Sequence, residues 1–203
     1  MTLSQPPDND RRLTMSRQPS PTHNRWYTEQ YNTRRGLTDE WVDDLLQQQW
    51  PAWSEAARAN TPCVLDLSYG AHEREVIDLF PIPDSKKWIV FIHGGYWKAM
   101  HGSASSFIAP PLTAAGYNVA LPSYRLCPDV TIGTIIDECA QAIAWLTRHA
   151  GEYSAGCDEI IVTGHSAGGH LAAAMFTVDW AQHGVAPSLF CGGIALSGLF
   201  DLD

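Results

Sequence analysis

The sequence predicts an α/β fold in which a mostly parallel β-sheet carries helices on both faces. Apolar runs at Trp88–Ile92 and Glu159–Thr163 are typical of strands that are buried on both sides. A helical pattern over Thr134–Ala150 separates these two runs. Strand-like and helix-like segments alternate from Val64 onward, which is the order that builds a parallel sheet with crossover helices.

Length and composition favour one globular domain and exclude some partners. The chain has 203 residues, of which 45% are hydrophobic, with 8 Trp, 7 Tyr and 6 Phe to fill a core. Its formal net charge is −9, from 13 Lys and Arg against 22 Asp and Glu. Because phosphate binding needs a basic patch, we expect no nucleic-acid partner.

The cysteines indicate a reducing compartment. There are five, widely spaced and never in a CxxC pair, namely Cys63, Cys127, Cys139, Cys157 and Cys191. We interpret them as reduced thiols of a cytoplasmic protein, and we expect no metal site because HExxH is absent as well. No run of 18 apolar residues and no apolar leader occurs in the sequence, so we expect no membrane partner.

The N-terminal part divides into a tail and a helical segment. Residues 1–24 are rich in Pro, Ser, Asp, Asn and Arg, which predicts a disordered tail before a domain over residues 25–203; Met15 is an alternative start. Leu37–Asn60 has a helical pattern with several tryptophans, and Pro51 is expected to break it into two short helices. Because exposed tryptophans are costly, this segment should pack on the main domain or roof its site.

The remaining elements follow from the same patterns. Thr134 and Asp137 are expected to form a capping box at the start of the clearest helix. The other predicted strands are Val64–Leu67, Val76–Phe80, Asn118–Leu121 and Gly192–Leu196, and the other predicted helices are Ser105–Ala115 and Gly168–Trp180.

A nucleophile motif stands between a predicted strand and a predicted helix. Gly164-His165-Ser166-Ala167-Gly168 matches G-x-S-x-G, in which a sharp turn lifts the serine hydroxyl above the sheet edge. Residues two positions from the serine must be small, or they would collide with the strand and the helix. The motif makes Ser166 the candidate catalytic nucleophile. The alternative is a glycine-rich turn of structural or nucleotide-binding use, although GxGxxG and GxxxxGK[ST] are absent.

A second motif supplies candidates for an oxyanion hole. His93-Gly94-Gly95-Tyr96-Trp97 directly follows the strand that ends at Ile92. A tetrahedral oxyanion needs two or more preset N–H donors, and we expect them from Ala167 and from Gly94 or Gly95, with Tyr96 as a further candidate. Tyr96 and Trp97 are the candidate substrate-pocket residues. The alternative is a tight loop in which Trp97 only packs in the core.

Two histidines flank Ser166 in sequence, but neither is expected to be its base. His165 should point away from Ser166 along the turn, and His170 lies a full turn into the next helix. We interpret both as packing or hydrogen-bonded histidines.

With these motifs the chain resembles the arylformamidase (kynurenine formamidase) branch of the α/β-hydrolase superfamily, near the esterases and lipases that carry an HGG loop. The resemblance covers residues 26–203. Its most specific pieces are the HGG-x-W loop and the Tyr-x-Leu-Cys-Pro stretch that starts at Tyr124. Other matching pieces are Tyr31-Asn32, Tyr69-Gly70, Asp78-Leu79-Phe80-Pro81, the stretch from Gly164 to Ala172, and Ser197-Gly198-Leu199-Phe200-Asp201-Leu202.

The resemblance implies hydrolysis of a small amide or ester, such as N-formylkynurenine to kynurenine and formate. It implies a Ser-Asp-His triad and no metal or organic cofactor. The relatives also include carboxylesterases, so a general carboxylesterase is the alternative, and the residues leave a homodimer open.

In that branch the triad Asp and His follow later strands. After Ser166 the chain offers only His170, Asp179, His183, Asp201 and Asp203, and no Glu. We therefore expect the triad Asp and His to be missing from this chain and the fold to be truncated after about the sixth strand. On this view residues 1–203 are an inactive, poorly stable fragment whose last strand is an exposed apolar edge.

Overall fold

The computed structural model describes residues 38–201 of the chain. The predicted tail over residues 1–24, the alternative start Met15 and the Tyr31-Asn32 pair lie outside the described residues. The chain divides into two compact units, Met1–Val42 and Asp43–Asp203, and the second contains the sheet and the site discussed below.

The first described elements are helical, and the predicted break at Pro51 is wrong. A short helix α2 (Asp39–Asp44) leads into a π-helical turn η1 (Leu45–Gln49) and then into α3 (Trp50–Asn60). Pro51 sits in the first turn of α3, where a missing N–H costs nothing. The widened turn before it keeps helical backbone angles at Gln49 and Trp50, so the helical path continues.

Helix α3 packs on residues 103–107 of the main domain, and the tryptophan pattern predicted such packing. Trp50 and Trp53 contact Phe107, with ring centroids 5.4 and 6.3 Å apart. Ser54 Oγ donates to Ala104 O at 2.8 Å, and Arg58 Nη1 donates to Ser103 O at 2.7 Å. These contacts bury one side of the helix without covering all of its aromatic surface, because Trp53 remains exposed.

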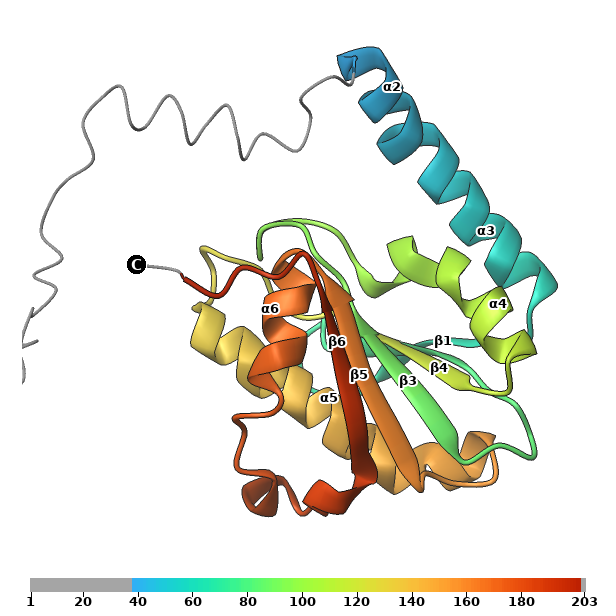
Figure 1. The fold of residues 1–203 in the computed structure, drawn as a ribbon, viewed down its shortest axis with the longest axis vertical. Helices are drawn as coiled ribbons and strands as arrows, with labels where there is room; N and C mark the ends of the chain where they lie inside the picture. Colours follow the sequence, from blue (N-terminus) through green and yellow to red (C-terminus); the bar gives the residue numbers. More distant parts are fainter. Residues whose placement is uncertain (1–37, 202–203) are drawn as a thin grey trace, which may run out of the picture. The chain divides into compact units, whose positions relative to one another are not determined.

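Six strands form one mixed sheet in the order β1-β2-β4-β3-β5-β6 (Figure 1). The first two pairings, β1 with β2 and β2 with β4, are antiparallel, and the others are parallel. The predicted strands are all present, each within two residues of its expected bounds. The strands are β1 (Val64–Ser68), β2 (Val76–Phe80), β3 (Lys87–Ile92), β4 (Asn118–Pro122), β5 (Glu159–His165) and β6 (Phe190–Leu196).

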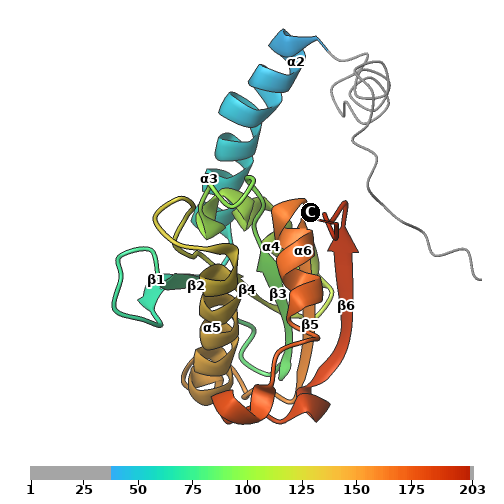
Figure 2. The same ribbon diagram turned by 90° about the vertical axis from the view of Figure 1, so that its left-hand side faces the viewer.

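Helices cover both faces of this sheet, as predicted (Figures 1 and 2). Successive side chains of a strand point to opposite faces. Accordingly Leu79 and Ala120 belong to the larger core cluster, and their neighbours Phe80 and Val119 belong to a second cluster. The larger cluster includes residues of α5 (Ile132–Tyr153) and α6 (Ala167–Ala174), and the smaller one lies against η2 (Gly102–Ile108) and α4 (Ala109–Ala114).

Three helix predictions need correction. The N-cap of α5 is Thr131, whose side chain accepts from Thr134 N, so Thr134 and Asp137 form no capping box. Thr131 takes the cap because its backbone is extended, which lets its side chain reach the amide of Thr134 one turn later. The expected helix over Ser105–Ala115 begins as the 3₁₀-helix η2.

The predicted helix over Gly168–Trp180 is also shorter than expected. Helix α6 ends at Ala174, and two 3₁₀ turns, η3 (Trp180–His183) and η4 (Pro187–Leu189), lead to β6. Trp180 Nε1 donates to Met175 O at 2.9 Å and so occupies a carbonyl that a longer helix would have used. The apolar residues after Met175 therefore serve tertiary packing instead of a helical stripe.

Across residues 38–201, no helix combines the length and the apolar character needed to span a bilayer.

Candidate active site

Ser166 occupies a sharp turn between β5 and α6. Its backbone angles are φ 57° and ψ −122°, far from the helical and extended regions that L-residues prefer. Ser166 N donates to Leu196 O at 2.8 Å, and Ser166 O accepts from His170 N at 3.1 Å, so strand β6 and the first turn of α6 hold the turn. A non-glycine residue in such a conformation is typical of the nucleophile elbow.

The two motif glycines lie where a side chain would collide with backbone. A Cβ at Gly164 would meet the carbonyl of Gly168 and would lie 2.7 Å from Ile92 O. A Cβ at Gly168 would meet the carbonyl oxygen of Ile92. The strand, the turn and α6 therefore pack at a separation that only glycine permits, as the motif predicted.

Strand pairing places the HGG loop beside Ser166. Strands β3 and β5 are parallel neighbours, with Ile92 opposite Gly164, so both chains leave the sheet at the same edge. A Cβ on Gly94 would lie 2.7 Å from His165 O and 3.3 Å from Ser166 Cβ. The backbone of Gly94 thus packs directly against the nucleophile and leaves no room for a side chain. Ala167, the residue after Ser166, begins α6.

The rest of the loop is tightly folded. Gly95 has a φ of 98°, and its carbonyl accepts from Lys98 N at 2.9 Å and Ala99 N at 3.0 Å. Tyr96 and Trp97 also have positive φ values, 52° and 57°. Bulky residues rarely adopt such angles, so contacts elsewhere must hold the loop in this shape.

The two candidate pocket residues differ in exposure. Tyr96 is 69% exposed, whereas Trp97 is 8% exposed and packs edge to face on His170 with ring centroids 5.4 Å apart. Trp97 Nε1 and His170 Nδ1 are both buried and have no hydrogen-bond partner within the described structure. Within the loop, the Tyr96 side chain is exposed to solvent, whereas the Trp97 side chain packs the loop against His170 of α6. Their role toward substrate stays a prediction.

Within residues 38–201, no hydrogen bond joins Ser166 Oγ to another side chain. His93 is fully buried, and burial lowers its pKa to about 3, so its ring is neutral. His170 packs on Trp97, and burial lowers its pKa as well. His183 packs on Trp180 in η3, and the exposed Asp201 follows β6 without an ion pair to any described residue. Among the described residues, then, none of these histidines is hydrogen-bonded to Ser166, and no His, Cys, Asp or Glu cluster among them is suited to a metal ion.

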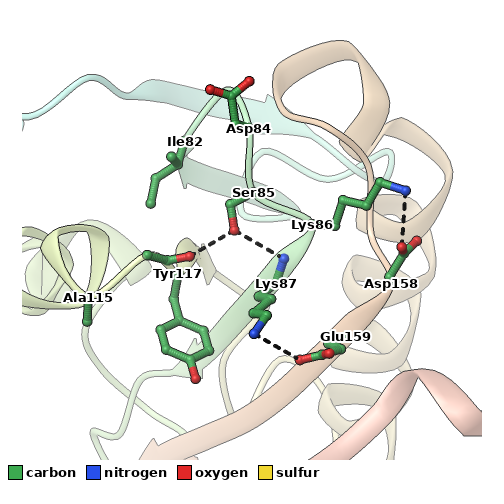
Figure 3. A pocket seen from close by; sticks show the side chains of 10 residues that line it. Ile82, Asp84, Ser85, Lys86, Lys87, Ala115, Tyr117, Asp158 and Glu159 are labelled. Atoms are coloured by element: carbon green, nitrogen blue, oxygen red, sulfur yellow. Dashed lines mark hydrogen bonds and ion pairs between the residues drawn. The ribbon is translucent and has the colours of Figure 1, made fainter.

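An open hollow of about 630 Å³ lies away from this chemistry (Figure 3). It opens near Lys87 and Glu159, the first residues of β3 and β5, whereas Ser166 follows the last residue of β5. Two ion pairs, Lys86–Asp158 at 3.1 Å and Lys87–Glu159 at 4.0 Å, join four of its charged side chains, and Asp84 has no ion pair to a described residue. Ligands of open α/β sheets bind at the carboxyl ends of the strands, so we do not assign this hollow to substrate. Its lining residues are Ile82, Asp84, Ser85, Lys86, Lys87, Ala115, Gly116, Tyr117, Asp158 and Glu159.

The chain matches a known protein family and is similar to two kynurenine formamidases. The BD-FAE family model matches residues 80–184, just over half of the chain and all of both motifs. Kynurenine formamidase of Danio rerio is 29% identical over 180 residues, which are 85% of this chain and 59% of that protein. Kynurenine formamidase of Drosophila melanogaster is 31% identical over 139 residues, 67% of this chain and 45% of that protein.

A solved structure agrees with these relatives. The crystal structure of a candidate thioesterase from Silicibacter sp. TM1040 superposes with a TM-score of 0.70 at 32% identity, covering 86% of this chain and 64% of that chain. The fold is thus that of the α/β hydrolases, as the resemblance implied. The chain spans about half of the length of the two formamidases and about two thirds of the thioesterase-like structure.

Proposed function

Because the chain belongs to the BD-FAE family, we propose that it is a serine hydrolase that cleaves a small amide or ester through an acyl-enzyme on Ser166. The observation that carries this proposal is the strained turn at Ser166, with the Gly94 backbone packed against it and α6 beginning at the next residue. A hydroxyl raised at a strand-to-helix turn next to free backbone N–H groups has the parts needed for acyl transfer.

The proposed reaction follows from this arrangement. Ser166 Oγ attacks the carbonyl carbon, and the amides of Ala167 and of Gly94 or Gly95 stabilise the oxyanion. The positive end of the α6 dipole, which starts at Ala167, favours the same charge. The leaving amine or alcohol departs with a proton, and water then hydrolyses the acyl-enzyme to release the acid and free Ser166.

The proton transfers need a general base, and we propose that it comes from outside residues 38–201. A base must lie within about 2.6–3.2 Å of the serine hydroxyl in the reacting complex. The fully buried ring of His93 and the packed ring of His170 are held by other contacts. Either residues beyond the described range or a second subunit would therefore supply the histidine and the acid that orients it.

The first test is labelling of Ser166. In the protein expressed from its complete reading frame, a fluorophosphonate should label this serine, because it alone would be activated. Ser166→Ala should remove both labelling and turnover. Ser197→Ala is the matched control, since Ser197 follows β6 at the same sheet edge and also has a positive φ, and it should retain labelling. Labelling that survives Ser166→Ala would identify another nucleophile.

The same assay locates the base. If the base lies outside residues 1–203, this chain expressed alone should show no Ser166-dependent turnover. An ordinary kcat, above roughly 1 s⁻¹, would place the base within this chain or a second copy of it.

For the substrate we propose an N-formyl aryl amine, with formate as the released acid. Two relatives are kynurenine formamidases, and the exposed Tyr96 ring beside the HGG loop suits an aryl group. The second candidate is a general carboxylesterase, which the likeness to a thioesterase-like structure favours. Assays of N-formylkynurenine, p-nitrophenyl acetate and p-nitrophenyl octanoate separate the two. We expect the highest kcat/KM for the formamide, and a preference for octanoyl or longer esters would favour the esterase.

A further inference from the structure

The loop that carries the proposed oxyanion donors is bound mainly by one neighbouring segment. This segment, Ser123–Cys127, follows β4 and contains the start of the Tyr-Arg-Leu-Cys-Pro stretch. The Tyr124 hydroxyl donates to His93 O at 2.8 Å and also lies 3.4 Å from Gly94 O. Cys127 N donates to Trp97 O at 2.8 Å. Both ends of the HGG loop are thus attached to the same short piece of chain.

Tyr124 also fixes the side chain at the start of the loop. Its ring stacks on His93 with centroids 4.1 Å apart and planes 4° from parallel. His93 Nδ1 lies 2.8 Å from Gly94 O, so this nitrogen carries the proton and donates back to the loop. Tyr124 is fully buried, and burial raises its pKa, so its hydroxyl stays protonated and acts as a donor.

Further bonds hold the segment itself in place. Arg74 Nε donates to Tyr124 O at 2.9 Å, and Arg74 Nη2 donates to Met100 O at 2.6 Å, so one guanidinium joins the segment to the end of the loop. Arg125 bonds through both its backbone N and its Nε to the buried carboxylate of Glu138 in α5. The segment is therefore anchored to the turn that contains Arg74 and to helix α5, in addition to the loop.

We propose that Tyr124 is a positioning residue, whose hydroxyl and ring hold Gly94 and Gly95 where their N–H groups meet the oxyanion formed at Ser166. This inference rests on the proposed function. Tyr124 cannot contact substrate itself, because none of its surface is exposed. Three non-glycine residues between 93 and 100, namely Tyr96, Trp97 and Met100, have positive φ values, so this stretch would relax without external bonds.

The test compares Tyr124→Phe with Tyr69→Phe. Both variants lose one hydroxyl that donates to the carbonyl of the residue directly after a strand: His93 O after β3 for Tyr124, and Ser123 O after β4, at 2.6 Å, for Tyr69. Only the Tyr124 hydroxyl bonds to the loop. In the protein from its complete reading frame, Tyr124→Phe should lower kcat roughly tenfold to hundredfold with KM within about twofold. Tyr69→Phe should leave kcat within about twofold.

A second readout does not depend on turnover. Amide hydrogen exchange of residues 93–100 should be faster in Tyr124→Phe than in Tyr69→Phe at matched thermal stability. Equal exchange in the two variants, or equal loss of kcat, would overturn the positioning role. Absence of Ser166-dependent turnover in the unsubstituted protein would instead overturn the proposed function, and the exchange measurement would still decide whether Tyr124 orders the loop.

Discussion

Single residues at this site adopt conformations that the rest of the chain must maintain. A positive φ at a non-glycine residue costs of order 1–3 kcal/mol, and Ser166, Tyr96, Trp97 and Met100 all have one. At Ser166, hydrogen bonds from both sides of the turn hold this geometry. The strain is concentrated where the proposed nucleophile and oxyanion donors lie, which is the usual location of such strain in enzymes.

Gly95 allows a direct test at this scale. A Cβ there would lie 2.5 Å from Ala99 O, at a φ of 98°. Gly95→Ala should therefore shift the loop and lower kcat about 10²-fold, as expected when one oxyanion donor is displaced, while thermal unfolding stays cooperative. The measurement is kcat together with a melting curve.

Gly116 provides the matched control for Gly95. Its φ is 90°, but a Cβ there meets nothing within 4 Å, so Gly116→Ala imposes similar backbone strain without a collision. This variant should keep kcat within about twofold. Equal kcat values in the two variants would mean that the HGG loop only packs.

At the scale of elements, parallel pairing of β3 and β5 assembles the site. The last residues of both strands lie side by side, so the HGG loop and the elbow meet although they are about 70 residues apart in sequence. Strand β6 adds a third contact, because Leu196 O accepts from Ser166 N. Continuous apolar runs predicted these strands, but the helix bounds depended on contacts that such sequence patterns do not contain. At the end of α6, Trp180 Nε1 donates to the Met175 carbonyl oxygen. At the start of α5, the cap is Thr131, one turn before the expected Thr134.

At the scale of the whole described chain, residues 38–201, the last strand of the sheet is an apolar edge. Strand β6 pairs with β5 on one side only within the described chain, and Ile194 and Leu196 are 55% and 47% exposed. The predicted exposure of this last strand is thus confirmed. Exposed edges of this kind pair readily with other chains. The net charge of −9 makes two copies repel each other, but salt screens this repulsion beyond about one Debye length.

This edge leads to a prediction about self-association. Residues 1–203 should associate at micromolar concentration, and Ile194→Lys should shift the chain toward monomer by placing a charge on the exposed strand. Leu65→Lys, at an exposed position of the opposite edge strand β1, is the control and should change association less, because no second exposed apolar side chain of β1 accompanies it. Sedimentation velocity measures both, and equal effects would show that the β6 edge is not the contact.

The sequence by itself determined where the strands lie along the chain, the need for glycine at positions 164 and 168, and the choice of Ser166 as the candidate nucleophile. These features are local: burial on both faces produces apolar runs, and a tight turn requires residues without a side chain. Only the tertiary structure decided which segments support the site. Tyr124 and Arg74 act through contacts with residues 26 to 50 positions away, and no local pattern encodes a contact between segments that meet only when the sheet has formed.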